Sequence, residues 1–337
     1  MTKAAFAWNS AAAVFSDLPL QVKLYQCSDL FRKLDADIRG GAFDLLFVHL
    51  IRMAEYARPF KAIPRILDMT DSIHLHYTRM PHLSLTLQGL AAPIERTRLQ
   101  RYEAAVCSWF DHVLLASPLD LAWLQSRRSE RNLVLCPTGI EIGAFPFYVG
   151  DFHPNRIIFV GKLDYLPNTD AAIYFAREIL PRIRRAIPNA EFVVAGWNPP
   201  GAVRKLAREP NVRVLPNVAD LRVEITQSAV SVAPMRFGSG IQVKILESLA
   251  LGTPAVATES VIGAFGEEGK KAILVGRNPD DFAEKVVSIL KDCAARERLR
   301  QSGRRLIERR FQWGQVLAPL DRILDGLAEK RFEARQC

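Results

Sequence analysis

The sequence predicts an α/β protein with two lobes, each built on a doubly wound parallel sheet. Two observations lead to this prediction. Short apolar, strand-like runs alternate with helix-like segments along most of the 337 residues, and this alternation breaks and restarts near residue 150. Strands that alternate with helices of about 10–15 residues are typical of βαβ units and parallel sheets. Continuous apolar runs fit strands that helices cover on both faces.

The first lobe is expected to span residues 1–150. Its strands are predicted at 43–50, 65–69, 112–117 and 132–137, and its helices at 52–60, 93–107 and 118–127. Residues 1–42 are expected to be mostly helical. The stretch 138–155 is rich in glycine, proline and aromatic residues and has no helical period, which is typical of a linker.

The second lobe is expected to begin at residue 151. Its strands are predicted at 156–161, 190–196, 212–216, 229–234, 254–258 and 272–276, and its helices at 168–186, 219–227, 241–251 and 280–290. Ligands of open α/β sheets bind beyond the carboxyl ends of the strands, in the cleft that we expect between the lobes. Functional residues are therefore expected in the loops that follow strands.

Composition excludes several classes of protein. The chain is 49% apolar and 24% charged, as globular proteins are. No apolar run approaches the roughly 20 residues of a membrane-spanning helix. Asn9 and Ser10 interrupt the alanine-rich start, so no signal peptide is expected. The five cysteines are scattered without a CxxC pair, which predicts neither zinc nor disulfides and fits the reducing cytoplasm.

The charge of the chain suggests what kind of partner it has. Of the net charge of +9, +2 falls in residues 1–150 and +7 in residues 151–337. Such an excess suits an anionic ligand, or peripheral contact with an anionic membrane surface. Nucleic acid is not expected, because the basic residues alternate with acidic and apolar ones and form no stripe with aromatics.

The stretch PMRFGSGIQVKILESLALGTPAVA (234–257) carries the first candidate site. Gly238, Ser239 and Gly240 follow a predicted strand and precede a helix, where backbone N–H groups are open to an anion. Lys244 could neutralise a phosphate, and Glu247, on about the same face, could accept two ribose hydroxyls. An ordinary glycine turn with a Lys244–Glu247 surface pair explains the same residues equally well.

Two further stretches carry candidate residues. In FVGKLDYLPN (159–168), Gly161 ends a strand and Lys162 follows at the carboxyl edge. Lys162 could be a second cation that faces the same anion, or it could simply extend its charged head into solvent at the strand end. LDMTDSIHLH (67–76) supplies Asp68, Asp71, His74 and His76, which could act as acid, base or hydroxyl binders. A helix cap by Asp71 or Ser72 is the alternative, and the two histidines lack a third metal ligand at a useful spacing.

Common cofactor motifs are absent. The chain has no GxGxxG after a strand, no GxxxxGK[ST] and no GxSxG. A dinucleotide oxidoreductase, a P-loop nucleotidase and a serine hydrolase therefore each lack their usual motif.

Together, residues 159–181, 190–199 and 234–258 resemble the donor-binding lobe of the family 4 retaining glycosyltransferases, which have the GT-B fold of two Rossmann-like lobes. The stretches 273–290 and 310–324 resemble the end of that lobe. Residues 18–26, 43–57, 65–72 and 110–124 are similar to sugar transferases of exopolysaccharide gene clusters. The resemblance divides the chain into 1–150, 151–310 and a C-terminal helix, 311–337, that packs back on the first lobe.

The resemblance implies a function and a set of roles. A hexose would pass from a UDP- or GDP-sugar to a saccharide or a lipid-linked acceptor, with retention of configuration and without a bound metal or other cofactor. Lys162 and Lys244 would hold the diphosphate, and Glu247 the ribose. The glycine loop, including Ser239, would lie against sugar and phosphate. The nucleotide site would also include Gly161, Gln242 and, near the base, Val218.

The chain departs from the family in two places. Ser239 stands where the family has the first of two glutamates, eight positions apart. The family's opening strand and glycine-rich loop have no counterpart in residues 1–42, so the first lobe would be incomplete. Two alternatives therefore stay open: a catalytically weak donor-lobe subunit that acts with a partner, and a GT-B sugar-nucleotide epimerase.

Overall fold

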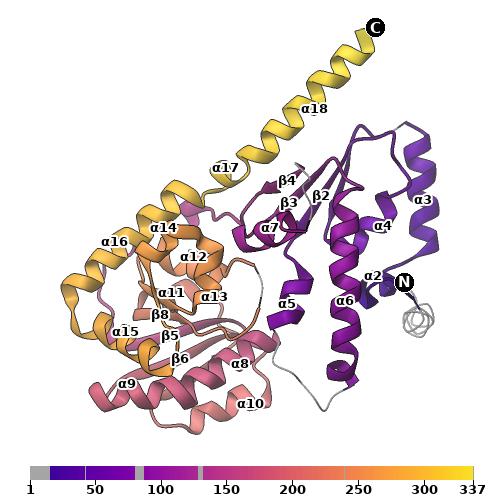
Figure 1. The fold of residues 1–337 in the computed structure, drawn as a ribbon. Helices are drawn as coiled ribbons and strands as arrows, with labels where there is room; N and C mark the ends of the chain where they lie inside the picture. The colour runs from indigo at the N-terminus through magenta and orange to yellow at the C-terminus, as the bar shows by residue number, and fades with distance from the viewer. Residues whose placement is uncertain (1–15, 42, 80–86, 128–131, 239, 337) are drawn as a thin grey trace. The chain divides into compact units, whose positions relative to one another are not determined.

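The computed structural model describes residues 16–41, 43–79, 87–127, 132–238 and 240–336. The chain forms two compact units, each with one parallel sheet (Figure 1). Unit 1 comprises Met1–Cys136 together with Pro319–Cys337, and unit 2 comprises Pro137–Ala318. The predicted α/β class is confirmed.

The sheet of unit 1 has four strands, which lie side by side in chain order. They are β1 (Leu46–His49), β2 (Arg65–Thr70), β3 (His112–Leu115) and β4 (Leu133–Leu135). All three pairings are parallel. Each strand falls within a predicted run or overlaps it closely. Among the described residues, β1 pairs only with β2, so it forms an edge of this sheet, and its Phe47 is 48% exposed.

The helices of unit 1 range in length from 3 to 21 residues. They are α2 (Leu20–Leu24), α3 (Ser28–Arg39), the 3-10 turn η1 (Ile51–Met53), α4 (Ala54–Ala57), α5 (Ile73–Arg79), α6 (Leu87–Cys107), α7 (Pro118–Gln125) and α18 (Ala318–Gln336). Of the described helices, none is long and apolar enough to cross a membrane. The helix α5 begins directly after Asp71 and Ser72, which the sequence offered as a helix cap in the alternative to a polar site.

A buried carboxylate explains why α5 forms. Glu103 of α6 is fully buried. It accepts hydrogen bonds from the Ser72 hydroxyl at 2.7 Å and from the His74 N–H at 2.9 Å. Ser72 in turn accepts the Leu75 N–H at 3.2 Å, as a helix-capping serine does. The capping interpretation of this segment is therefore confirmed for Ser72. Burial raises the pKa of Glu103 to about 7.

The sheet of unit 2 has six parallel strands, and the order in which the chain adds them reverses in the middle of the sheet. They are β5 (His153–Lys162), β6 (Glu191–Trp197), β7 (Val212–Pro216), β8 (Ser228–Ala233), β9 (Ala255–Ala257) and β10 (Ile273–Val275). The order is β10-β9-β8-β5-β6-β7, with every pairing parallel. The chain starts at the centre, builds outward through β6 and β7, and returns to build the other half. This is the Rossmann strand order, whose topological switch point lies between β5 and β8.

The helices of unit 2 fill the connections between its strands. They are α8 (Leu166–Tyr174), η3 (Phe175–Ile179, a π-helical stretch), α9 (Leu180–Ala186), α10 (Gly201–Arg204), η4 (Lys205–Arg208), α11 (Leu221–Thr226), α12 (Val243–Ala250), α13 (Glu259–Ile262), η5 (Gly263–Phe265), α14 (Gly266–Ala272), α15 (Pro279–Lys291), α16 (Cys293–Arg310) and α17 (Trp313–Val316). A further 3-10 turn, η2, spans Ile142–Ala144. Figure 1 shows α8 and α9 on one side of the sheet and α12 and α14 on the other.

Side chains on both faces of β5 are buried, as its continuous apolar run predicted. Phe159 lies in the large core cluster of unit 2, with Phe175 and Phe192, whose ring centroids are 4.4 Å apart. The alternate residues Ile158 and Val160 lie in a separate cluster, with Ile225 of α11. Because both faces are covered, the functional part of this sheet is restricted to its edges and loops.

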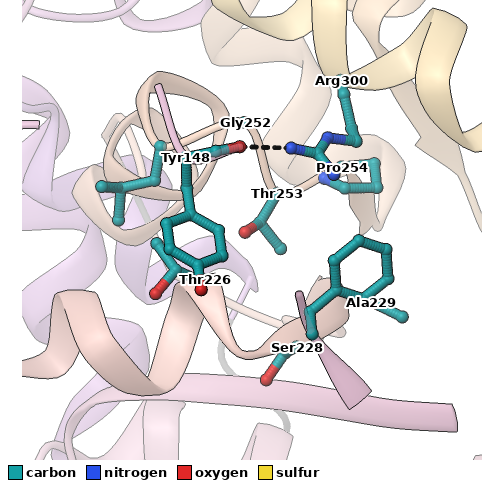
Figure 2. Close-up of a pocket in the computed structure, with 10 residues that line it drawn as sticks. Tyr148, Thr226, Ser228, Ala229, Gly252, Thr253, Pro254 and Arg300 are labelled. Carbon is teal, nitrogen blue, oxygen red and sulfur yellow. Dashed lines mark hydrogen bonds between the residues drawn. The ribbon is translucent and has the colours of Figure 1, made fainter. Parts of the chain in front are cut away.

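The predicted linker is packed into unit 2. Two arginines of α16 donate to backbone carbonyls of this segment: Arg300 to Tyr148, and Arg304 to Phe145 at 2.7 Å. The Arg300 guanidinium also lies over the Phe147 ring, 5.3 Å from its centroid. Figure 2 shows the bond from Arg300 to Tyr148 beside a small pocket of about 10 Å³, room for about one water molecule.

Candidate functional site

The switch point of unit 2 brings two candidate loops together. The loop after β5 leads into α8, and the loop after β8 leads into α12. Because β5 and β8 are neighbours in the sheet, both loops leave it at the same edge. A Cβ atom added to Gly238 would lie 4.0 Å from Pro167 Cβ, which places the two loops in contact. This is the edge where Rossmann-type sheets bind ligands.

Lys244 is the central residue of this site. It occupies the first turn of α12 and is only 8% exposed. Its Nζ lies 4.2 Å from the centroid of the Phe159 ring and donates a 2.5 Å hydrogen bond to Asn168 Oδ1. The interpretation of Lys244 and Glu247 as an ordinary surface pair is therefore wrong, because the amine is buried and points at the end of β5.

Asn168 links the two candidate loops. Its Oδ1 accepts the bond from Lys244, while its Nδ2 donates to the backbone oxygen of Lys162 at 2.9 Å. The second bond fixes the orientation of the amide, since the nitrogen must face a carbonyl. The sequence prediction did not include Asn168, because its partner lies 76 positions away in the chain.

Two glycines clear the space around this amine. A Cβ atom on Gly161 would lie 3.2 Å from Lys244 Nζ and 3.0 Å from Asn168 Nδ2. Gly196, paired with Gly161 in the β5–β6 register, has φ of 156°, and a Cβ atom there would lie 1.8 Å from Gly161 O. The carboxyl ends of β5 and β6 therefore approach more closely than side chains allow.

Burial shifts the pKa values of both charged groups on α12. Desolvation lowers the pKa of Lys244 to about 7, although Glu247 pulls it upward. Burial likewise raises the pKa of Glu247, although Lys244 pulls it downward. Both groups are therefore biased toward their uncharged forms, and an anion near Nζ would favour the charged lysine.

The start of the second loop is anchored on both sides. Met235 and Phe237 are buried. Arg236, between them, points the other way and forms a forked ion pair with Asp170 of α8, with Nε 2.9 Å from Oδ2. Its guanidinium also lies over the Tyr174 ring, 4.9 Å from the centroid. This pair fixes the loop against α8 and was not predicted from the sequence.

The other predicted donor-site residues are less enclosed. Lys162 ends β5 with its side chain 68% exposed, and its Nζ lies 3.8 Å from Asp164 Oδ1. Gln242 is the N-cap residue of α12. Val218, in the loop after β7, is partly buried against the small cluster of β5 and β6. Gly240 has φ of 72°, and Ser239 lies outside the described residues.

The candidates of the first lobe lie in unit 1. Asp71 follows β2, and its N–H donates to Met69 O at 2.8 Å. Asp68 is held by His49, whose Nδ1 lies 2.8 Å from its Oδ2. His74 is buried, stacks on Trp123 at 4.8 Å between centroids, and has a pKa lowered by burial. The side chain of His76 lies outside what the structure describes.

Neither of two hollows in unit 2 lies at the switch point. The small pocket of Figure 2 and an open depression of about 460 Å³, lined by Arg156, Glu191 and Asn211, both lie at the amino-terminal edge of the sheet. Arg156 is buried and paired with Glu224 at 2.5 Å, which is a structural role. Within the described ranges, no group of three or more His, Cys, Asp or Glu residues is placed to hold a metal.

Comparisons with known proteins relate the chain to a family of enzymes. Residues 154–292 match the family described as glycosyl transferases group 1. Over this stretch, which spans the sheet of unit 2, the chain is similar to the group 1 glycosyltransferases. It is 23% identical over 287 residues to a phosphatidyl-myo-inositol mannosyltransferase of Mycobacterium leprae, covering 77% of this chain and 74% of that protein. It is 26% identical over 215 residues to a glycogen synthase of Mycobacterium tuberculosis, covering 60% of this chain and half of that protein's length.

Solved structures show that the chain has the GT-B fold. A sucrose-phosphate synthase from Thermosynechococcus elongatus superposes with a TM-score of 0.70 at 17% identity, covering 89% of this chain and 78% of that one. HepE of Anabaena, solved in complex with UDP, superposes with a TM-score of 0.63 at 13% identity, covering 88% and 82%. Family 4 glycosyltransferases of this fold transfer sugars from nucleotide-sugar donors with retention of configuration.

Proposed function

We propose that this glycosyltransferase transfers a hexose from a nucleoside-diphosphate sugar, UDP- or GDP-linked, to a saccharide or lipid-linked acceptor in polysaccharide biosynthesis. The observation that carries the proposal is Lys244, a buried amine at the switch point with a neutral amide as its acceptor. A diphosphate there would gain a cation that water does not screen. HepE, which has the same fold, was solved with UDP-glucose.

The proposal gives each part of the site a role. Lys244 and Lys162 supply positive charge where the diphosphate departs, which is where negative charge develops in the transition state. No metal is needed for this neutralisation. Glu247, half buried on α12, accepts the ribose hydroxyls, and the 238–240 loop meets sugar and phosphate. Gly161, Gln242 and backbone near Val218 complete the nucleotide site. The scattered cysteines support a cytoplasmic location. The excess of basic residues supports peripheral contact with an anionic membrane surface.

Asp71 is assigned to the acceptor reaction. It follows β2 at the carboxyl edge of the unit 1 sheet, where a carboxylate can bind a hydroxyl or take its proton. Asp71→Asn is expected to lower turnover with an acceptor while leaving nucleotide affinity unchanged, as calorimetry and nucleotide release would show. Loss of nucleotide binding in this variant would contradict the assignment.

Calorimetry with UDP, GDP and ADP tests the donor site. One nucleotide is expected to bind, and Lys244→Ala and Glu247→Ala are each expected to weaken it at least tenfold, about 1.4 kcal/mol. Glu267 and Lys270 on α14 provide a matched control. They form an exposed pair at the same three-residue spacing, 2.6 Å apart, so their alanine variants should bind normally. Equal losses in the control variants would contradict a site at α12.

A partner subunit with little activity of its own is a second candidate function. The edge strand β1, with its half-exposed Phe47, favours it, because an unpaired strand edge can accept another chain. A folded protein that binds none of the three nucleotides would support this candidate over the glycosyltransferase proposal.

A further inference from the structure

We propose that Asn168 positions Lys244 as a buried, uncharged amine in the free enzyme, and that the diphosphate of the donor draws a proton onto this amine when it binds. Donor binding would then take up a proton from solution. The inference rests on the proposed function, because it takes a nucleotide sugar as the ligand of the switch point.

The hydrogen bonding around Nζ is incomplete for a charged lysine. An ammonium group carries three N–H donors. Among the described residues, its one hydrogen-bond acceptor is Asn168 Oδ1, and its other close neighbour is the Phe159 ring face. The ring face attracts a cation weakly, but neither neighbour carries a negative charge, and only one of the three N–H groups has a hydrogen-bond acceptor in the described part of the chain. A buried ammonium needs an opposite charge or full hydrogen bonding, so this environment fits the neutral amine.

Within the described part of unit 2, the elements packed around Lys244 do not supply the missing charge. On β5, Phe159 and Gly161 face the amine, and the Lys162 head is exposed to solvent. On α8, Asp170 is taken by the forked pair with Arg236. On α12 itself, Glu247 is the nearest carboxyl group, and burial raises its pKa, which reduces its own charge. On β8, Ser231 bonds to Ser248 at 2.9 Å.

Asn168 acts through Lys244 and is therefore a positioning residue. Its Nδ2 is occupied by Lys162 O, so only its neutral oxygen can face Nζ. It holds the amine against Gly161, at the end of β5, without giving it a counter-charge. An aspartate in the same place would give that counter-charge and would keep Lys244 protonated before the donor arrives.

The direction of the linkage follows from these contacts. A bound diphosphate favours the ammonium form, so its arrival raises the pKa of Lys244 above the value of about 7 that burial sets. At pH 8 the free amine is mostly neutral and the bound one is charged. Affinity should therefore fall as the pH rises above 7, by up to about tenfold per pH unit.

Calorimetry with UDP-glucose at pH 8, in buffers of different ionisation enthalpy, tests the inference. UDP-glucose is the preferred probe because its diphosphate diester does not titrate in this range. The measured enthalpy should vary with the buffer and give an uptake of close to one proton per donor bound. If UDP-glucose does not bind, GDP-mannose and ADP-glucose replace it.

Three variants locate the proton. Lys244→Arg keeps a permanent charge and should bind without proton uptake and with little dependence on pH between 7 and 9. Asn168→Asp should also lose the uptake and should bind more weakly, because its carboxylate competes with the diphosphate. Lys162→Ala removes an exposed cation, so it should lower affinity but keep the uptake and the pH profile of the wild type.

The outcomes separate this inference from the proposed function. Donor binding whose enthalpy is independent of the buffer overturns the inference and leaves the proposed function standing. Uptake that persists in Lys244→Arg also overturns it, because the proton then goes elsewhere. Absence of binding by all three sugar nucleotides overturns both.

Discussion

Each unit buries an ionisable side chain beside its sheet, but the two are partnered differently. In unit 1, Glu103 accepts hydrogen bonds from the Ser72 hydroxyl and the His74 N–H, and these bonds build the start of α5. In unit 2, Lys244 has a neutral amide oxygen and a ring face. The first group is satisfied by its own fold. The second has bonding capacity that its own fold leaves unused.

The difference suggests how a binding residue can be told from a structural one. Burying a charge costs free energy unless partners compensate for it. Where the chain supplies the partners, as for Glu103 and for Arg156 with Glu224, the group stabilises the fold. Where the chain supplies few, as for Lys244, the cost persists in the free protein and a ligand can recover it. Three experiments, taken from the largest expected effect to the smallest, test this comparison.

Gly196→Ala is expected to have the largest effect. In unit 1 the residues at the ends of β1 and β2, Leu50 and Thr70, have positive φ and still carry side chains. In unit 2 a Cβ atom on Gly196 would lie 1.8 Å from Gly161 O. The variant should lose about 3–5 kcal/mol of unfolding free energy, measured by denaturant titration.

Gly201 is the control for this substitution. It begins α10, and a Cβ atom there would meet nothing within 4 Å. Gly201→Ala should change stability by no more than about 1 kcal/mol, because alanine is the better helix former. Similar losses of stability in both variants would show that the close approach of β5 and β6 is not the reason why position 196 requires glycine.

Replacing the two buried ionisable groups by apolar ones compares the units directly. Glu103→Leu leaves the Ser72 hydroxyl and the His74 N–H without their acceptor and should cost about 2–4 kcal/mol of unfolding free energy at pH 7. Lys244→Met removes a poorly partnered amine and should leave stability unchanged or raise it, while donor binding is lost. Thermal and denaturant unfolding at pH 7 measure both. Equal destabilisation by the two would remove the proposed distinction.

Arg236→Lys should have the smallest effect. A lysine cannot form the forked pair with Asp170, so the loop after β8 should be held less firmly. Because Arg236 is half exposed, the loss should be at most about 1 kcal/mol, a few-fold in donor affinity. The control is Arg222→Lys, which breaks a forked pair with Asp220 elsewhere in unit 2. A similar loss of affinity in the control would argue against a specific role for Arg236.

The strands could be predicted from the sequence more fully than the site. All ten strands in the described residues overlap predicted apolar runs. The signal is clearest for strands such as β8, whose six residues are all buried, because residues buried on both faces of a parallel sheet must be apolar. The helix predicted at 168–186 is present as α8, η3 and α9. The helices α5, α10, α13, α14 and α16 were not predicted. Of these, α5 depends on the contact of Glu103 with Ser72, which lie 31 positions apart.

The candidate site was predicted only in part. Glycines after a strand, followed by a helix with a lysine, indicate an anion site from local pattern alone. Whether Lys244 is buried depends on Phe159 and Asn168, which come from another βα unit. For that reason, the spacing of residues within 234–257 does not distinguish a surface pair from a ligand site. The same holds for Arg236, whose partner Asp170 lies 66 positions earlier.

The arginines of α16 have a practical consequence for dissecting the protein. Arg300 and Arg304 hold the backbone of Phe145 and Tyr148 through their carbonyl oxygens. A fragment cut at residue 151, where the sequence pattern restarts, would remove these acceptors and expose two guanidinium groups that now lie largely under the chain. A fragment spanning 137–318 would keep them. Anyone preparing the donor half alone for crystallisation or ligand screening should therefore begin the gene at the codon for Pro137.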